Sequence, residues 1–146
     1  MKSILAEFFE RDLNKLINEV NAFGNEADLW KVKGDIKNPA GNLVLHIIGG
    51  TNYLIGNVLG GTGYVRNRAA EFADKDIEAA ALIVELKKLI VVVTSTLDHI
   101  SPEDMEKEYP IFFDKPGATT GYVLTQLLLH LNYHLGQVNY LRRILE

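Results

Sequence analysis

Two histidines four residues apart, His130 and His134, are the side chains of this sequence whose type and spacing best suit chemistry. They lie in an apolar run, Gln126–Leu135, that is typical of a helix. In a helix, residues i and i+4 share a face about 5–6 Å apart, so two imidazoles can converge on one metal ion. Burying both without partners would cost about 1–3 kcal/mol for each unsatisfied group. We expect a metal ion, and a hydrogen-bonded structural pair or a solvated pair are the alternatives.

A third histidine, His46, lies far away in a second apolar helical segment. A lone buried histidine is more often a hydrogen-bonded core residue than a ligand. However, Gly49 removes a side chain one turn later, and such a gap leaves room for a ligand between facing helices. Three neutral imidazoles with an open position form a catalytic type of metal site. Gln137, one turn after His134, is a candidate to hydrogen-bond a ligand or an imidazole.

Other polar side chains give weaker indications. Asp114 and Glu71 are candidates for a general base, but we expect both to be ordinary solvated loop carboxylates. Arg66 and Arg68 are candidates to hold an anionic group, although loop arginines are usually solvated. His99 ends a helix, where a protonated histidine is favoured electrostatically, so we assign it no site role. No phosphate loop, nucleophile elbow or dinucleotide fingerprint is present.

Length and composition restrict the class of protein. A chain of 146 residues suits one domain, residues 1–146. The net charge of −4 argues against a nucleic-acid partner, because phosphate binding needs a basic surface. The absence of cysteine excludes disulfides and thiolate ligands and fits a reducing compartment. No apolar run reaches the roughly 20 residues of a membrane span, and Glu7 interrupts any signal peptide. We expect a soluble, cytoplasmic protein with no membrane partner.

Apolar residues at helical spacing predict four long helices, over residues 3–22, 39–59, 76–99 and 120–146. The β-branched centre of the third helix would suit a strand by propensity, but its length and period favour a helix. Segment 61–76 is expected to be a loop. Four helices of similar length joined by loops predict an all-α fold, a four-helix bundle with long inter-helix loops.

Local signals mark the ends of these helices. Asn38 followed by Pro39 predicts an N-cap and a first helical residue. Gly60 and the glycine after it predict the end of the second helix. Thr119 or Thr120 is expected to cap the last helix.

The motif Asn42–Gly49 and the motif His130-x-x-x-His134-Leu-Gly136-Gln137 together resemble those of the DinB-like (damage-inducible) superfamily of four-helix-bundle metalloenzymes. The stretch Arg66–Phe72 is similar to one uncharacterised branch of that superfamily. The resemblance implies that His46, His130 and His134 bind a divalent metal ion, zinc or nickel, and that water completes the shell.

The resemblance also implies a function. It indicates a metal-dependent enzyme, a hydrolase or a thiol-dependent transferase, acting on an unidentified small molecule, and it identifies no catalytic residue. The alternative is a non-catalytic domain that binds a metal or ligand and serves stress-related interactions. The third helix is apolar on more than one face through Leu89–Val93, more than one bundle core needs, which predicts a homodimer. Dimers are common in the superfamily.

Overall fold

The structure, a computed structural model, describes residues 1–146 and is all-α, with no β-strands. Its α-helices are α1 (Lys2–Asn21), α2 (Ala40–Thr51), α3 (Arg68–Ala73), α4 (Ala79–His99), α5 (Pro102–Glu106) and α6 (Thr120–Leu145). A short 3₁₀ helix, η1 (Glu26–Trp30), precedes α2, and a π-helical segment, η2 (Asn52–Asn57), continues it. None of the helices combines the length and the hydropathy that crossing a membrane requires.

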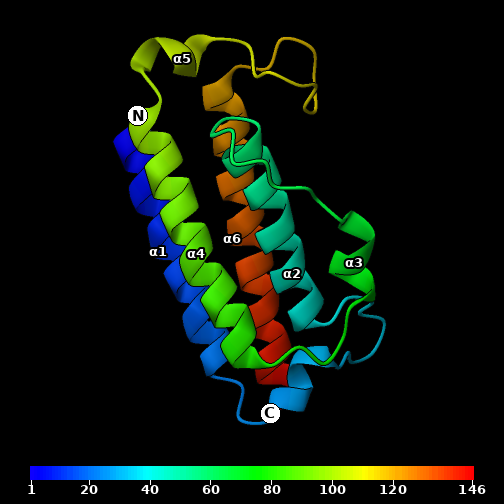
Figure 1. Cartoon of the computed structure of the whole chain (residues 1–146). Coiled ribbons are helices and arrows are strands. Elements are labelled where there is room, and N and C mark those ends of the chain that lie inside the picture. Colours follow the sequence, from blue (N-terminus) through cyan, green and yellow to red (C-terminus); the bar gives the residue numbers. More distant parts are fainter.

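Four helices, α1, α2, α4 and α6, lie side by side, and three shorter segments lie around them (Figure 1). Both α1 and α2 pack against α4 and α6. Helices α1 and α6 run in one direction and α2 and α4 in the other (Figure 1). A crossover descends along the outside of α2, carries α3, and leads to the start of α4 (Figure 1). The N- and C-termini lie at opposite ends of the molecule (Figure 1).

Helix α6 shows how the sequence places the histidines. Its buried apolar residues recur at helical spacing and form one stripe toward the core: Val123, Leu124, Leu127, Leu131, Leu135, Val138 and Leu141. His130 and His134 each precede a leucine of this stripe by one residue. The two imidazoles therefore lie at the flank of the core, on the side of α2, and not in the centre of the apolar layer.

The boundaries of the long helices agree with the sequence prediction at most ends. Thr119 caps α6, its side chain accepting a hydrogen bond from the backbone N–H of Tyr122 at 3.2 Å. The β-branched centre of α4 is helical, and Leu86, Leu89 and Val93 within it are buried. Packing of this face against α1 therefore outweighs the strand propensity of the segment.

Three details of the prediction were wrong. The N-cap of α2 is Pro39 and not Asn38, because Pro39 is still extended, with ψ 157°. Segment 61–76 contains α3, whose N-cap Asn67 accepts a hydrogen bond from Ala70 N–H at 3.1 Å. Helix α4 begins at Ala79 and not at 76, because Asp76 has φ 58°, outside the helical region.

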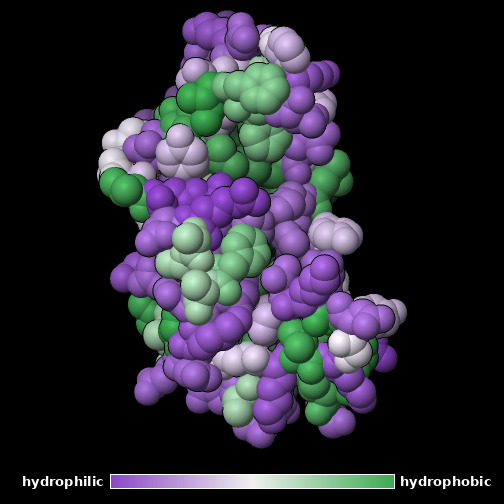
Figure 2. Space-filling model, turned by 90° about the vertical axis from the view of Figure 1, so that its right-hand side faces the viewer, coloured by the Kyte–Doolittle hydropathy of each residue, from purple (hydrophilic) through white to green (hydrophobic).

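The face on which α3 lies is mostly hydrophilic, with separate apolar patches toward its two ends (Figure 2). Inside, the buried apolar side chains form one cluster that includes residues of all four long helices. Polar contacts join the helices at the edge of this cluster. Among them, Arg142 on α6 donates to Glu19 on α1 at 2.8 Å.

Candidate metal centre

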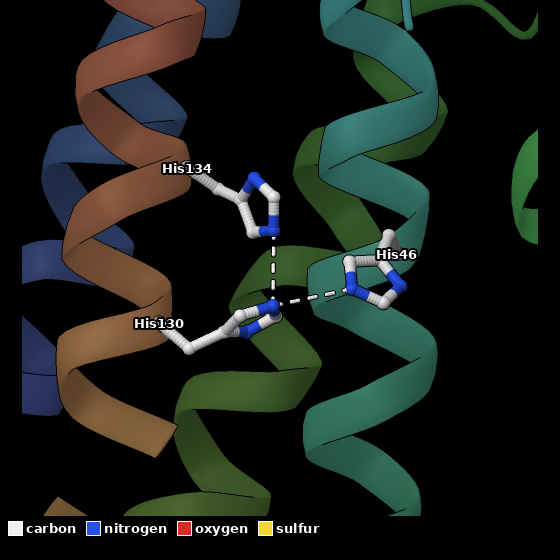
Figure 3. Close-up of side chains that lie close together, drawn as sticks. All are labelled: His46, His130 and His134. Atoms are coloured by element: carbon white, nitrogen blue, oxygen red, sulfur yellow. Dashed lines mark hydrogen bonds between the residues drawn. The ribbon is translucent and has the colours of Figure 1, made fainter. Parts of the chain in front are cut away.

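Three imidazoles from two helices point toward one another (Figure 3). His130 and His134 come from α6, and His46 comes from α2. The Nε2 atoms of His130 and His134 lie 3.0 Å apart, and those of His46 and His130 lie 3.3 Å apart. All three ligand atoms lie within 4.8 Å of one another. Zinc–nitrogen bonds of about 2.0–2.1 Å in tetrahedral geometry place ligand nitrogens about 3.3 Å apart, so the spacing fits one ion.

Glu71 determines which ring nitrogen of His46 carries the proton. The Nδ1 atom of His46 lies 2.9 Å from Oε1 of Glu71. Burial raises the pKa of Glu71, but hydrogen bonds from Arg66 and His46 outweigh this effect and leave the pKa below its usual value. Because an ionised carboxylate only accepts, His46 donates through Nδ1–H. Its Nε2 atom therefore keeps a lone pair that faces the other histidines.

His134 is oriented in the same way by Gln137. Its Nδ1 atom lies 2.6 Å from Oε1 of Gln137, to which it donates. Burial lowers the pKa of His134 more than the hydrogen bond to Gln137 raises it. Burial, followed by the neighbouring His134, His46 and Arg66, lowers the pKa of His130 to about 4. The two imidazoles of α6 are therefore neutral near pH 7, the form that binds a metal.

The three Nε2 atoms converge. His46 and His134 both turn an Nε2 acceptor toward Nε2 of His130, which carries at most one proton and can donate to one of them. At least one of the two short Nε2 contacts, at 3.0 and 3.3 Å, therefore has no proton between its nitrogens, and the two partly negative atoms repel each other. A cation between the three nitrogens turns this repulsion into attraction. The donor set fits a divalent ion of the zinc or nickel type.

Glu71 is buried against α2. Only 6% of its side chain is exposed, and it accepts hydrogen bonds from Arg66 Nε and Nη2 at 2.8 and 2.9 Å. Gly49 and Gly50 make room for this pair. A Cβ at Gly49 would lie 2.7 Å from Cδ of Glu71, and one at Gly50 would lie 3.2 Å from Nη2 of Arg66. The amide of Asn42 donates to the backbone carbonyl of Glu71 at 3.0 Å and fixes the segment.

A cavity of about 430 Å³ opens beside His46 and His130. Arg66, Arg68 and Asp114 are among its lining residues. A second cavity, of about 330 Å³, has His134 and Gln137 among its lining residues. Each histidine of the cluster therefore lines one of two cavities, and a molecule in the larger one would meet His46 and His130 directly.

The structure brings together the three histidines that the sequence singled out. Gln137 contacts His134, and a role in ligand binding stays a prediction. His99 lies outside the cluster, and its Nδ1 donates to the carbonyl of Ser95 at 2.8 Å.

Two sequence interpretations of the site need correction. Glu71 was expected to be solvated and is instead buried against His46, because the two glycines of α2 leave space for its carboxylate. These adjacent glycines were the signal for it in the sequence. Burial was expected for both His130 and His134, but His130 is exposed and His134 is only partly buried.

Comparison with known proteins places the chain in a family. The model of a family of proteins of unknown function, DUF1572, matches residues 3–146. A search of curated proteins gave no match. Because the match extends over nearly the whole sequence, the chain belongs to the DUF1572 family.

Proposed function

We propose that this chain is a metal-dependent enzyme, a hydrolase or a thiol-dependent transferase, that binds one divalent ion through His46, His130 and His134. The observation that carries the proposal is the convergence of three Nε2 atoms on one point beside a cavity. Zinc and nickel are the preferred ions, because both accept imidazole ligands. With three protein ligands, a position is left for water or substrate, as in catalytic sites.

The role of the bound ion would be to polarise a substrate or to lower the pKa of bound water to about 7. The protein supplies the positions of the ligands. Glu71 and Gln137 hold the Nδ1 protons of His46 and His134, so both Nε2 atoms stay available as donors. Arg66 keeps Glu71 ionised and in place. Such partners of ligating histidines commonly change metal affinity about 10–100-fold.

We also propose that the four long helices form a single DinB-like four-helix-bundle domain. Two features support this relationship: the ring of contacts among α1, α2, α4 and α6, and the distribution of the histidines over α2 and α6. The family match is compatible with it. A cytoplasmic location fits the lack of cysteine in the sequence.

A homodimer through α4 is part of the proposal. The side chains of Val84 and Val91 lie seven residues apart on this helix and are 49% and 65% exposed. Light scattering of the purified protein gives its mass in solution. If the wild type has the mass of a dimer and Val91→Lys has the mass of a monomer, the result supports the interface. A monomeric wild-type protein contradicts it.

Metal analysis tests the site. The protein purified without chelators should contain about one zinc or nickel ion per chain, and His46→Ala should contain none while keeping its helical circular dichroism. His99→Ala is the matched control, because His99 lies outside the cluster, and it should keep the ion. Finding no metal in the wild type, even after incubation with zinc or nickel, would refute the proposal.

Activity assays test the catalytic part. The metal-loaded wild type and His46→Ala are compared on panels of ester, amide and thiol-transfer substrates. If the wild type turns over a substrate and His46→Ala does not, the result supports an enzymatic function. Metal binding without turnover on any panel favours the non-catalytic alternative.

A further inference from the structure

The cavity beside His46 and His130 carries charges of both signs that the protein does not neutralise. Of the charged groups at this cavity, Arg66 is paired with Glu71 through two hydrogen bonds. Arg68 and Asp114 also line the cavity. The guanidinium of Arg68 makes no hydrogen bond or ion pair in the chain, and no ion pair joins it to Asp114. One free cation and one free anion therefore face the same space.

The carboxylate of Asp114 is held in place rather than free to turn away. It accepts a hydrogen bond from the hydroxyl of Tyr122 at 2.7 Å, and Gln126 donates to that hydroxyl at 3.1 Å. The neighbouring cation, Lys115, lies over the Tyr122 ring at 4.1 Å and forms no ion pair with Asp114.

The backbone conformation of Asp114 also indicates that its carboxylate is held in place. Its φ of 62° is unusual for a residue other than glycine. Residues kept in this region are often found at ligand sites. The carboxylate of Asp114 thus projects from a sharp turn of the loop at the cavity.

We propose that the cavity binds a small zwitterionic molecule, whose anionic group pairs with Arg68 and whose ammonium group pairs with Asp114. A molecule with one charge would satisfy only one of these residues and leave the other solvated. A zwitterion satisfies both and lies beside the three histidines. The proposal rests on the proposed function only for the ligand's role as substrate, because the two ion pairs do not need the metal.

Amino acids with separated charges are suitable probes. A titration series of γ-aminobutyrate and δ-aminovalerate is compared with butyrate and butylamine, which each carry one of the two charges. Binding is followed by the amide signals of isotope-labelled protein, with and without zinc. The preferred zwitterion should bind about fivefold more tightly than either singly charged probe, the gain expected from one added ion pair.

Variants assign each end of the ligand. Arg68→Gln should reduce the affinity for the zwitterion to that for butylamine, and Asp114→Asn should reduce it to that for butyrate. Asparagine tolerates positive φ, so the second variant keeps the loop conformation. Arg143→Gln removes an exposed arginine at the far end of α6 and should leave the affinity unchanged.

Equal affinities for the zwitterions and the singly charged probes would overturn the proposal, as would the absence of any binding. Zwitterion binding that needs zinc and survives both variants would overturn it as well, because the ligand would then be held by the metal alone. Zwitterion binding in a protein that takes up no metal would support this proposal and refute the proposed function.

Discussion

The carboxylate of Glu71 occupies the space that a side chain at Gly49 would fill. A Cβ built at Gly49 would overlap Oε2 of Glu71 and lie 2.7 Å from its Cδ. Gly49 lies nearly one turn after His46, and Glu71 accepts the Nδ1 proton of His46 at 2.9 Å. The absence of one side chain on α2 thus determines the tautomer of a candidate metal ligand on the same helix.

Gly49→Ala should weaken metal binding. The added methyl group forces Glu71 away from His46, so the imidazole loses the acceptor that orients it. We expect the dissociation constant for zinc, measured by competition with a chelator, to rise about 10–100-fold. Gly136→Ala is the matched control, because a Cβ at Gly136 would meet no atom within 4 Å. It should keep the zinc affinity and stabilise the helix by about 0.5–1 kcal/mol. Unchanged zinc affinity in Gly49→Ala would contradict the role assigned to Glu71.

Glu71→Gln should separate the charge of this side chain from its shape. The amide still offers an oxygen to His46 but no longer forms an ion pair with Arg66, so the imidazole is held less firmly. We expect zinc affinity to fall about tenfold, the lower end of the effect of such partners. Glu85→Gln, which removes an exposed carboxylate paired with Lys88, should leave the affinity unchanged. Equal losses in both variants would mean that overall charge, and not orientation, is responsible.

The three histidines were predictable because their signals are local. The spacing of His130 and His134 depends only on helical geometry, and the segment around His46 has its own apolar period. The long helices followed from the same periodicity. The cap by Thr119 is also local, since its hydroxyl bonds a backbone N–H three residues later.

The role of Glu71 was not predictable in this way. Its burial depends on α3 packing against α2, and α3 has only six residues, too few to show a helical period. The contact between Asn42 and the carbonyl of Glu71 joins residues 29 positions apart. Sequence patterns describe one element at a time, so a carboxylate in a polar segment was interpreted as solvated until the packing was known.

Zinc should stabilise the folded protein. An ion that binds only the folded state adds about 4 kcal/mol to the free energy of unfolding at a concentration 1,000 times its dissociation constant. We expect the midpoint of thermal unfolding to rise with zinc concentration in the wild type and in His99→Ala. His46→Ala and His134→Ala should show no such rise. A rise of equal size in all four proteins would show that zinc binds elsewhere.

Asp12 should make stability depend on acid pH. Its side chain is 1% exposed and accepts hydrogen bonds from Arg11 Nε at 2.8 Å and Asn132 Nδ2 at 3.1 Å. Burial raises the pKa of Asp12, but these bonds outweigh burial and lower it overall. The folded pKa thus lies below the unfolded value of about 3.9, so the stabilisation is complete above that pH and is lost as pH falls toward the folded pKa.

Asp12→Asn should therefore lower the free energy of unfolding by about 1–3 kcal/mol at pH 7, the cost of weakening a buried hydrogen-bonded group. Below about pH 4 the difference from the wild type should shrink, because the wild-type carboxyl is protonated first in the unfolded state and, at still lower pH, in the folded state as well. Urea unfolding at pH 7 and at decreasing acid pH measures both effects. Asp35→Asn, at an exposed loop position, is the control and should follow the wild type throughout. A loss in Asp12→Asn that stays constant down to the lowest pH would show that packing, and not the charge of Asp12, joins α1 to α6.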